Sequence, residues 1–252
     1  MTIQYASDLH LEFPENHRFL KENPLQPKGD VLVLAGDIVP FALMDKFKDF
    51  FQYVSDHFPV VYWIPGNHEY YHFDIANKCG ILREKIRSNV FLVNNMEVQH
   101  KGVSFVFSTL WSRIDPARQW YIEKAMNDFQ VIKYEGFRFS IDRFNKLHEE
   151  CINFMKQAKQ RDKADKTVAV THHVPTLLNY PKQYIDSDLN EAFAVELSDF
   201  IETTDFDYWI YGHHHSNTQD FSIGKTKLLT NQLGYVQYGE HAAFKTGAVI
   251  DS

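Results

Sequence analysis

One pattern recurs along this 252-residue chain: a short apolar run is followed at once by side chains that can bind a metal ion or transfer a proton. The runs at residues 31–35 and 60–64 have the length and composition of buried β-strands. Because the carboxyl ends of parallel strands meet at one crevice of an open α/β sheet, we expect the polar clusters to converge. The five clusters are Asp8-Leu9-His10, Gly36-Asp37, Gly66-Asn67-His68-Glu69, His172-His173 and Gly212-His213-His214-His215.

The other periodicities predict a layered α/β fold, because helical stripes alternate with strand-like runs. Strands are expected at 2–7, 31–35, 60–64, 91–98, 103–107, 168–171 and 207–211, with a hairpin over 221–229 and a last strand at 247–250. Helices are expected at 42–57, from a cap at Asp74 to Ile86, at 141–160 and at 192–203, and residues 11–29 read as a polar loop.

Residues 111–139 interrupt this alternation. The segment has no clear period and is rich in aromatic residues, among them Trp111, Trp120 and Phe129, but poor in Gly and Ser. A linker has the opposite composition. We therefore expect an insert or cap segment within a single domain that spans residues 1–252.

Charge and composition exclude some functions. The net charge of −7 does not suit a protein that binds nucleic acid along its phosphates. No run of ~18 apolar residues is present to span a membrane, and residues 1–9 lack the basic start and apolar segment of a secretory signal. We expect a cytoplasmic protein, with Cys79 and Cys151 as buried free thiols.

The donor types in the five clusters are carboxylates, an amide and imidazoles, without cysteine. This set excludes iron–sulfur and structural zinc sites and suits Mn, Fe, Zn, Co or Ni at raised coordination number. Each cluster alone is a weak signal, since Gly36-Asp37 also reads as a turn. The adjacent histidines 213–215 also fit a histidine-rich metal tract without catalysis. The recurrence of suitable donors at strand after strand favours one shared site.

In order and spacing, Asp8-x-His10, Gly36-Asp37, Gly66-Asn67-His68-Glu69, His172 and Gly212-His213-x-His215 resemble the calcineurin-like metallophosphoesterase superfamily. A looser similarity, in Thr109-Leu110-Trp111 and Asn127-Asp128-Phe129, is to its small bacterial phosphohydrolases. The resemblance implies a four-layer αββα sandwich, with two mixed β-sheets flanked by helices. It also implies two divalent metal ions. Matching positions give Asp8, His10, Asp37 and His215 to one metal and give Asn67, His172 and His213, with a bridge from Asp37, to the other.

The activity that this resemblance implies is hydrolysis of a small phosphate mono- or diester by metal-activated hydroxide. His68 would be the catalytic imidazole that assists the leaving group, and manganese is the foremost candidate metal. Asn67 and His173 are expected substrate contacts, although His173 could equally lie behind the metal ligands. Glu69 is expected to anchor the loop. Because Ile38-Val39-Pro40-Phe41 follows Asp37, the arginine and acidic partners of Ser/Thr protein phosphatases are missing. A nuclease acting on nucleic-acid ends and a catalytically silent metal-binding scaffold remain as alternatives.

Overall fold

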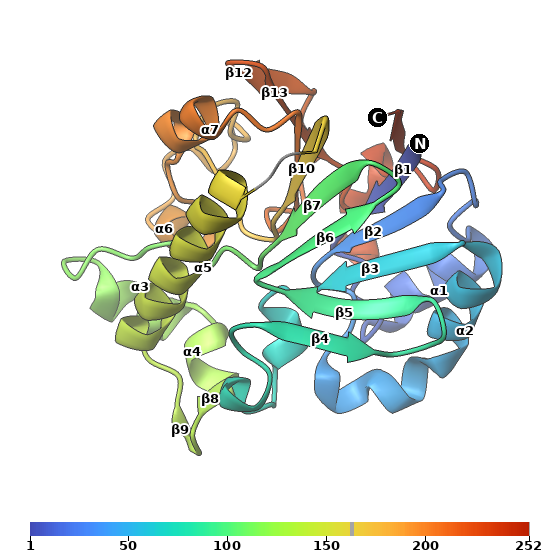
Figure 1. The fold of residues 1–252 in the computed structure, drawn as a ribbon. Helices are drawn as coiled ribbons and strands as arrows, with labels where there is room; N and C mark the ends of the chain where they lie inside the picture. The colour runs from blue at the N-terminus through green and yellow to red at the C-terminus, as the bar shows by residue number, and fades with distance from the viewer. Residues whose placement is uncertain (162–163, 252) are drawn as a thin grey trace.

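The computed structural model describes residues 1–161 and 164–251 and contains two six-stranded sheets that pack face to face (Figure 1). The first sheet has the order β14 (Val249–Asp251), β1 (Thr2–Ala6), β2 (Val31–Ala35), β3 (Val60–Ile64), β5 (Val90–Asn94) and β4 (Leu82–Lys85). The second has the order β12 (Phe221–Ile223), β13 (Thr226–Thr230), β11 (Tyr208–Tyr211), β10 (Lys166–Val170), β7 (Val103–Phe107) and β6 (Met96–His100).

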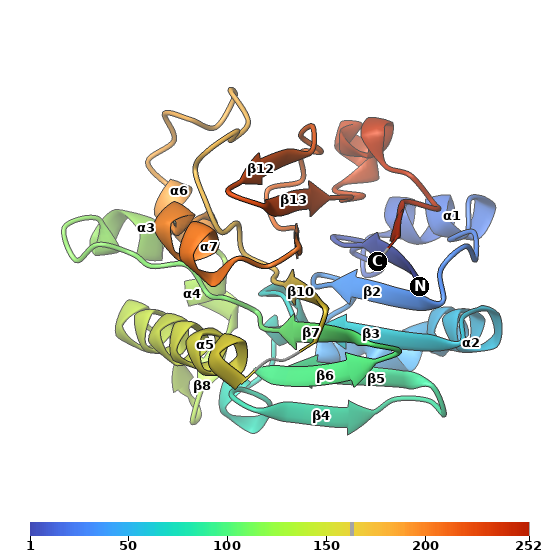
Figure 2. The same ribbon diagram turned by 45° about the horizontal axis from the view of Figure 1, so that its top comes forward.

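Each sheet has a parallel centre and antiparallel edges. Strands β1, β2, β3 and β5 pair in parallel in the first sheet, as do β7, β10, β11 and β13 in the second. The edge strands β14, β4, β6 and β12 pair antiparallel to their neighbours. The carboxyl ends of the central strands are therefore free to present side chains at one side of the sandwich (Figure 2).

Strand β2 shows why these apolar runs form a sandwich. Val31, Val33 and Ala35 belong to the cluster buried between the two sheets. Leu32 and Leu34 point the other way, into the cluster under the helices. Because successive side chains of a strand alternate in direction, a strand that is apolar at every position must be covered on both faces. The prediction of a doubly buried strand at residues 31–35 is confirmed.

Helices cover the outer faces of both sheets, which completes the expected four layers (Figure 1). The helices are α1 (Pro14–Glu22), α2 (Lys48–His57), α3 (Gln119–Ala125), α4 (Asp128–Val131), α5 (Ile141–Arg161), α6 (Asn190–Phe193) and α7 (Ser198–Thr204). Helix α2 packs on the first sheet, where the Phe51 ring lies 5.1 Å from that of Trp63. Helix α5 packs on the second, with Phe144, Cys151 and Met155 buried, as the helical stripe predicted.

Three expected elements were wrong. The single strand at 91–98 is divided into β5 and β6, which belong to different sheets. The helix from Asp74 to Ile86 is absent: a short 3-10 turn, Ile75–Asn77, ends before Gly80, whose φ is +71°, and strand β4 follows. Pairing with β5 outweighed the apolar spacing, so half-buried Cys79 lies outside any helix. The polar loop at 11–29 contains α1, because Pro14 occupies the first turn of a helix, where proline is favoured.

Two expected helices are shorter than predicted. The segment at 42–57 begins with a 3-10 helix, Phe41–Phe47, and becomes α-helical only from Lys48. The segment at 192–203 consists of α6 and α7, separated by an extended stretch that pairs Ala194 with Val174. The hairpin over 221–229 is confirmed as β12 and β13, with Gly224 in the left-handed region at its turn.

The aromatic segment 111–139 forms α3, α4 and a small hairpin of β8 (Lys133–Tyr134) and β9 (Phe137–Arg138). Its buried rings pack on α5, since Phe129 lies 5.7 Å from Phe144. Trp120 and Phe137 are exposed. Trp111, Phe129 and Phe139 therefore extend the core. Among the described residues, no helix has the length and apolarity needed to cross a membrane.

Candidate metal centre

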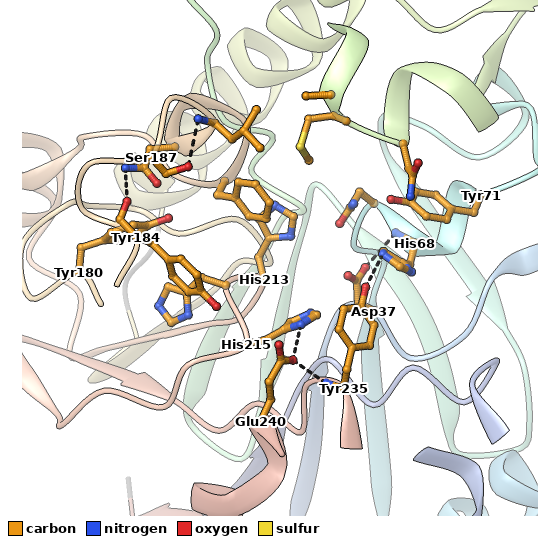
Figure 3. A pocket seen from close by; sticks show the side chains of 18 residues that line it. Asp37, His68, Tyr71, Tyr180, Tyr184, Ser187, His213, His215, Tyr235 and Glu240 are labelled. Carbon is orange, nitrogen blue, oxygen red and sulfur yellow. Dashed lines mark hydrogen bonds and ion pairs between the residues drawn. The ribbon is translucent and has the colours of Figure 1, made fainter. Parts of the chain in front are cut away.

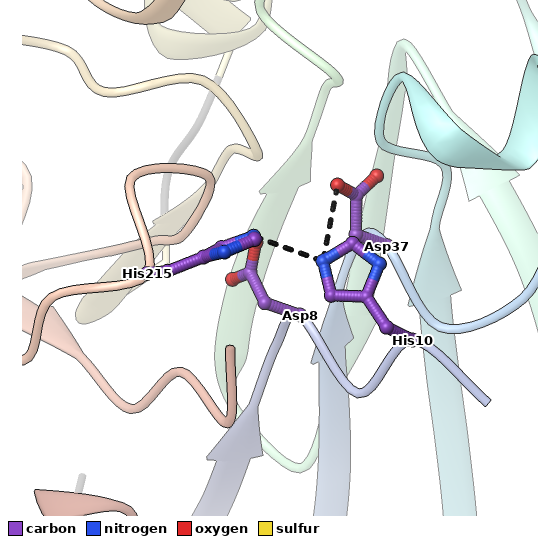
Figure 4. A group of neighbouring side chains, drawn as sticks. All are labelled: Asp8, His10, Asp37 and His215. Atoms are coloured by element: carbon purple, nitrogen blue, oxygen red, sulfur yellow. Dashed lines mark hydrogen bonds and ion pairs between the residues drawn. The ribbon is translucent and has the colours of Figure 1, made fainter. Parts of the chain in front are cut away.

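The predicted ligands come together at the carboxyl ends of the parallel strands (Figure 4). One group comprises Asp8, His10, Asp37 and His215, whose donor atoms lie within 4.8 Å of one another. A second group comprises Asp37, His172 and His213, within the same limit. Asn67 adjoins the second group, because its Oδ1 lies 3.2 Å from Nε2 of His172. Side chains more than two hundred positions apart thus share one site.

Asp37 belongs to both groups through a single atom. Its Oδ2 lies 3.8 Å from Nε2 of His10 and 3.3 Å from Nε2 of His172. Its other oxygen, Oδ1, accepts a hydrogen bond from the backbone N–H of His68. One oxygen is therefore oriented by the fold, and the other faces two sets of donors. This is the arrangement that a carboxylate bridging two cations requires.

In each of the four clustered imidazoles, the ring nitrogen that faces away from the centre makes a hydrogen bond to an oxygen atom. Nδ1 of His172 donates to the carbonyl of Ala35 at 2.9 Å, and Nδ1 of His215 donates to Glu240 at 2.9 Å. Nδ1 of His10 donates to Glu12, and Nε2 of His213 donates to the carbonyl of Ala192. Carbonyl and carboxylate oxygens only accept, so these nitrogens carry the hydrogen. The nitrogen facing the centre then has a free lone pair, as metal-binding histidines do.

The backbone is strained where the ligands sit. Asp8, His10, Asp37, His213 and His215 all have positive φ, between 46° and 83°. L-residues avoid this region, and residues held there cluster at functional sites. Backbone hydrogen bonds enforce the turn, since the N–H of Asp8 donates to Gly36 and that of His10 donates to Asp37.

The absence of a side chain at Gly66 leaves room for the side chain of His172. A Cβ atom there would lie 2.6 Å from Nε2 of His172, closer than real Cβ contacts allow. Glu69 holds the loop that begins at this glycine. Its carboxylate accepts from the N–H groups of Asp37, Ile38 and Gly66 at 2.7–2.9 Å. The prediction that Glu69 anchors the loop is confirmed, and the anchor joins the second and third clusters.

Charge explains why the cluster suits a cation. Burial alone would raise the pKa of Asp37, but the surrounding His172, His68 and His10 hold it well below its ordinary value. Burial would lower the pKa of His172, yet the Asp37 carboxylate raises it to about 9. The cluster thus attracts protons in the positions where metal ions would bind. Metal binding there would release those protons and replace their positive charge.

Sequence reasoning missed Glu12, although it follows His10 by two residues. Its Oε1 accepts from Nδ1 of His68 at 3.0 Å and from Nδ1 of His10 at 3.3 Å. Burial would raise the pKa of Glu12, but these two hydrogen bonds lower it to about 2. The available signal was the spacing Asp-x-His-x-Glu, although the backbone at Asp8 and His10 is left-handed and not extended. One carboxylate therefore orients a predicted ligand and the predicted catalytic imidazole.

Sequence reasoning also gave Asp128 no role in the site. This fully buried carboxylate, in α4, accepts from Nδ2 of Asn67 at 2.9 Å and from the hydroxyl of Tyr71 at 2.8 Å. Because the amide nitrogen is turned to Asp128, the amide oxygen of Asn67 is turned to His172. Asn127-Asp128-Phe129 was noted only as part of a resemblance, and nothing in it points to Asn67, which lies 61 positions away.

This contact leads to a prediction for Asp128→Ala. Loss of the acceptor should free the Asn67 amide to rotate and weaken the second metal position by about 10–100-fold, as loss of such supporting partners does. Titration with Mn²⁺ under calorimetry measures this affinity. Tyr71→Phe is the matched control, because it removes the other donor to the same oxygen and should leave metal affinity within about threefold. Equal effects of the two variants would contradict the proposed orientation.

The structure corrects the expectation for His173. Its side chain is fully buried behind His213, with ring centroids 4.2 Å apart, and packs on Trp111. It does not line the cavity that opens above the metal ligands. The backbone N–H groups of His172 and His173 both donate to Thr109, which turns the second side chain into the core. In this structure His173 thus lies behind the metal ligands, whereas Asn67 and His68 line the cavity.

A model of the calcineurin-like phosphoesterase family matches residues 1–217, which include all the predicted ligands. The chain belongs to this family. It is accordingly a phosphoester hydrolase, and the site just described occupies the family's matched region. Strands β12, β13 and β14 lie beyond the matched residues but complete both sheets.

Individual relatives extend the comparison. An uncharacterised protein of Acanthamoeba polyphaga mimivirus is 34% identical, over 99% of this chain and 96% of its own length. The crystal structure of a phosphopantetheinyl hydrolase from Mycobacterium tuberculosis superposes with a TM-score of 0.73 at 18% identity, over 99% of this chain and 95% of that chain. A dimetal phosphatase from Danio rerio aligns at 12% identity with a TM-score of 0.44, over 92% and 87%, which is too distant to carry an inference. The superposition on the phosphopantetheinyl hydrolase structure supports the two-sheet fold.

Proposed function

We propose that this phosphoesterase uses two divalent metal ions, manganese foremost, to hydrolyse a small phosphate mono- or diester. One observation carries the proposal: a single oxygen of Asp37 faces His10 on one side and His172 on the other. Asp8, His10, Asp37 and His215 would hold one ion. Asp37, Asn67, His172 and His213 would hold the second. When bound, such ions activate water and stabilise charge on the phosphoryl oxygens.

The residues of this chain would supply positioning and a proton. Nδ1 of His68 donates to Glu12, and its ring stacks on Tyr71 with centroids 4.0 Å apart. Its Nε2 is thereby directed towards the cavity, 3.5 Å from the hydroxyl of Tyr235. Burial would lower the pKa of His68, but Asp37 and Glu12 outweigh it and raise the pKa. A protonated imidazole at this position can donate to the leaving oxygen of the ester.

The two alternatives have less support. A nuclease needs cationic side chains along the nucleic-acid backbone, and none of the described residues that line the cavity is Lys or Arg. A silent scaffold would be expected to have lost His68 or a ligand. Here the seven predicted ligands are gathered, and His68 is held by the partly buried carboxylate of Glu12. We therefore favour catalysis over either alternative.

The test is metal analysis combined with an activity assay. After saturation with Mn²⁺ and removal of free metal, we expect two ions per chain and a raised melting temperature, because binding to the folded state stabilises it. The loaded protein should hydrolyse activated aryl phosphate esters, and the metal-free protein should not. Loading with a single ion, or no turnover of any ester by protein that holds two ions, would contradict the proposal.

A further inference from the structure

The cavity above the metal ligands extends to both sides of them (Figure 3). It has a volume of about 370 Å³, in the range of pockets that enclose an organic ligand. His68 and Tyr71 lie on one side of Asp37, and Tyr180 and Tyr184 lie on the other. We call the part lined by Tyr180, Tyr184 and Phe193 the tyrosine lobe. A phosphoryl group over Asp37 would thus have room for a substituent in each direction.

The charge of the wall limits what the cavity can accept. Its described lining includes Glu240 and Asp37 but no lysine or arginine. Two further carboxylates, the partly buried Glu12 and the fully buried Asp128, accept hydrogen bonds from His68 and Asn67. A terminal phosphate carries two negative charges and is usually held by arginine or lysine in addition to metal. A phosphodiester carries only one charge and has less need of such partners.

The tyrosine lobe offers neutral contacts. Tyr180 and Phe193 present rings, and Ser187 and Asn190 present uncharged polar groups. Tyr184 is half-buried, and its hydroxyl makes no hydrogen bond within the described part of the chain. Its backbone is held by a hydrogen bond to Pro181 and by the Asn190 side chain, which donates to the Tyr184 carbonyl. An aromatic side chain on a backbone held in this way, with a free polar end, suits an uncharged, flat or amide-bearing group.

We infer that the substrate of this site is a phosphodiester whose retained substituent is uncharged and lies in the tyrosine lobe, while the leaving group lies beside His68. This inference rests on the proposed function. In the reaction, the oxygen of water bonds to phosphorus as the bond to the leaving oxygen breaks. The leaving oxygen takes a proton from His68, which regains one from the attacking water. The products are an alcohol and a phosphomonoester that keeps the substituent of the tyrosine lobe.

Three esters with the same leaving group test the inference on the Mn²⁺-loaded enzyme: p-nitrophenyl phosphate, methyl p-nitrophenyl phosphate and phenyl p-nitrophenyl phosphate. We expect kcat/KM for the phenyl diester to exceed that for the monoester by at least about tenfold and to exceed that for the methyl diester through a lower KM. A kcat/KM for the monoester equal to or above those of both diesters would overturn the inference but leave the proposed function standing. No turnover of any of the three would instead overturn the proposed function.

Tyr184→Ala locates the retained substituent. Loss of one aromatic contact to the phenyl ring should raise KM for the phenyl diester about tenfold and leave that for the methyl diester within about twofold. Tyr121→Ala, which removes an exposed tyrosine of α3 outside the cavity, is the matched control. Calorimetric binding of diphenyl phosphate should weaken about tenfold in Tyr184→Ala alone. Equal changes for both diesters, or unchanged binding of diphenyl phosphate, would overturn the assignment of the lobe.

Discussion

Replacing Asp37 by asparagine is expected to lower kcat/KM by at least roughly 10³-fold and to reduce the bound metal from two ions to one or none. The carboxylate supplies the oxygen that faces both groups of ligands, and the amide oxygen of asparagine is neutral and binds cations more weakly. Losing the shared ligand removes stabilisation of the transition-state charge, which is worth several kcal/mol in metal-assisted reactions. A loss of about 4 kcal/mol corresponds to this fold-change.

Metal analysis and steady-state kinetics on the same preparation measure this effect. Asp45→Asn is the control, because Asp45 lies on the surface in the 3-10 helix before α2 and pairs only with Lys48 among the described residues. It should leave both metal content and rate unchanged. Circular dichroism separates loss of metal from loss of fold. An Asp37→Asn protein with two bound ions and full activity would refute the bridging role.

Replacing His68 by alanine is expected to lower kcat by about 10²–10⁴-fold, the range for loss of a general acid, with metal content near two ions per chain. The two effects should separate because His68 belongs to neither of the two groups that share Asp37 and donates through Nδ1 to Glu12. The loss should shrink for esters with a very acidic leaving group, since such a group departs without a proton. Normal kcat in His68→Ala, or complete loss of metal, would be inconsistent with this role.

The control for His68 is another histidine that contacts none of the ligands. His57 is exposed at the end of α2, and its Nδ1 donates to the carbonyl of Tyr53. His57→Ala should not alter kcat for any ester. Rates measured with p-nitrophenyl and unsubstituted phenyl esters give the dependence on the leaving group in both variants. A dependence identical to that of the unmodified enzyme in His68→Ala would show that His68 does not protonate the leaving oxygen.

The fold was predictable where burial alone decides the structure. The apolar run of β2 must be covered on both faces, and the apolar stripe of α5 must be covered on one side. The spacing of apolar residues was therefore enough to predict a strand and a helix. The segment before β5 was misjudged because Ile75, Cys79, Leu82 and Ile86 fit a helical spacing. There, the left-handed Gly80 and pairing with a neighbouring strand outweighed that local spacing.

By itself, the sequence determined which donor types are present and that each follows a strand, because those facts depend only on residue identity and on short-range periodicity. The tertiary structure alone decided how the donors are aimed. Ala35 orients His172, Glu240 orients His215, and Asp128 orients Asn67, and each partner lies between 25 and 137 positions away. Such hydrogen bonds leave no periodic signal. They depend on the packing of the two sheets, which brings residues far apart in the chain together.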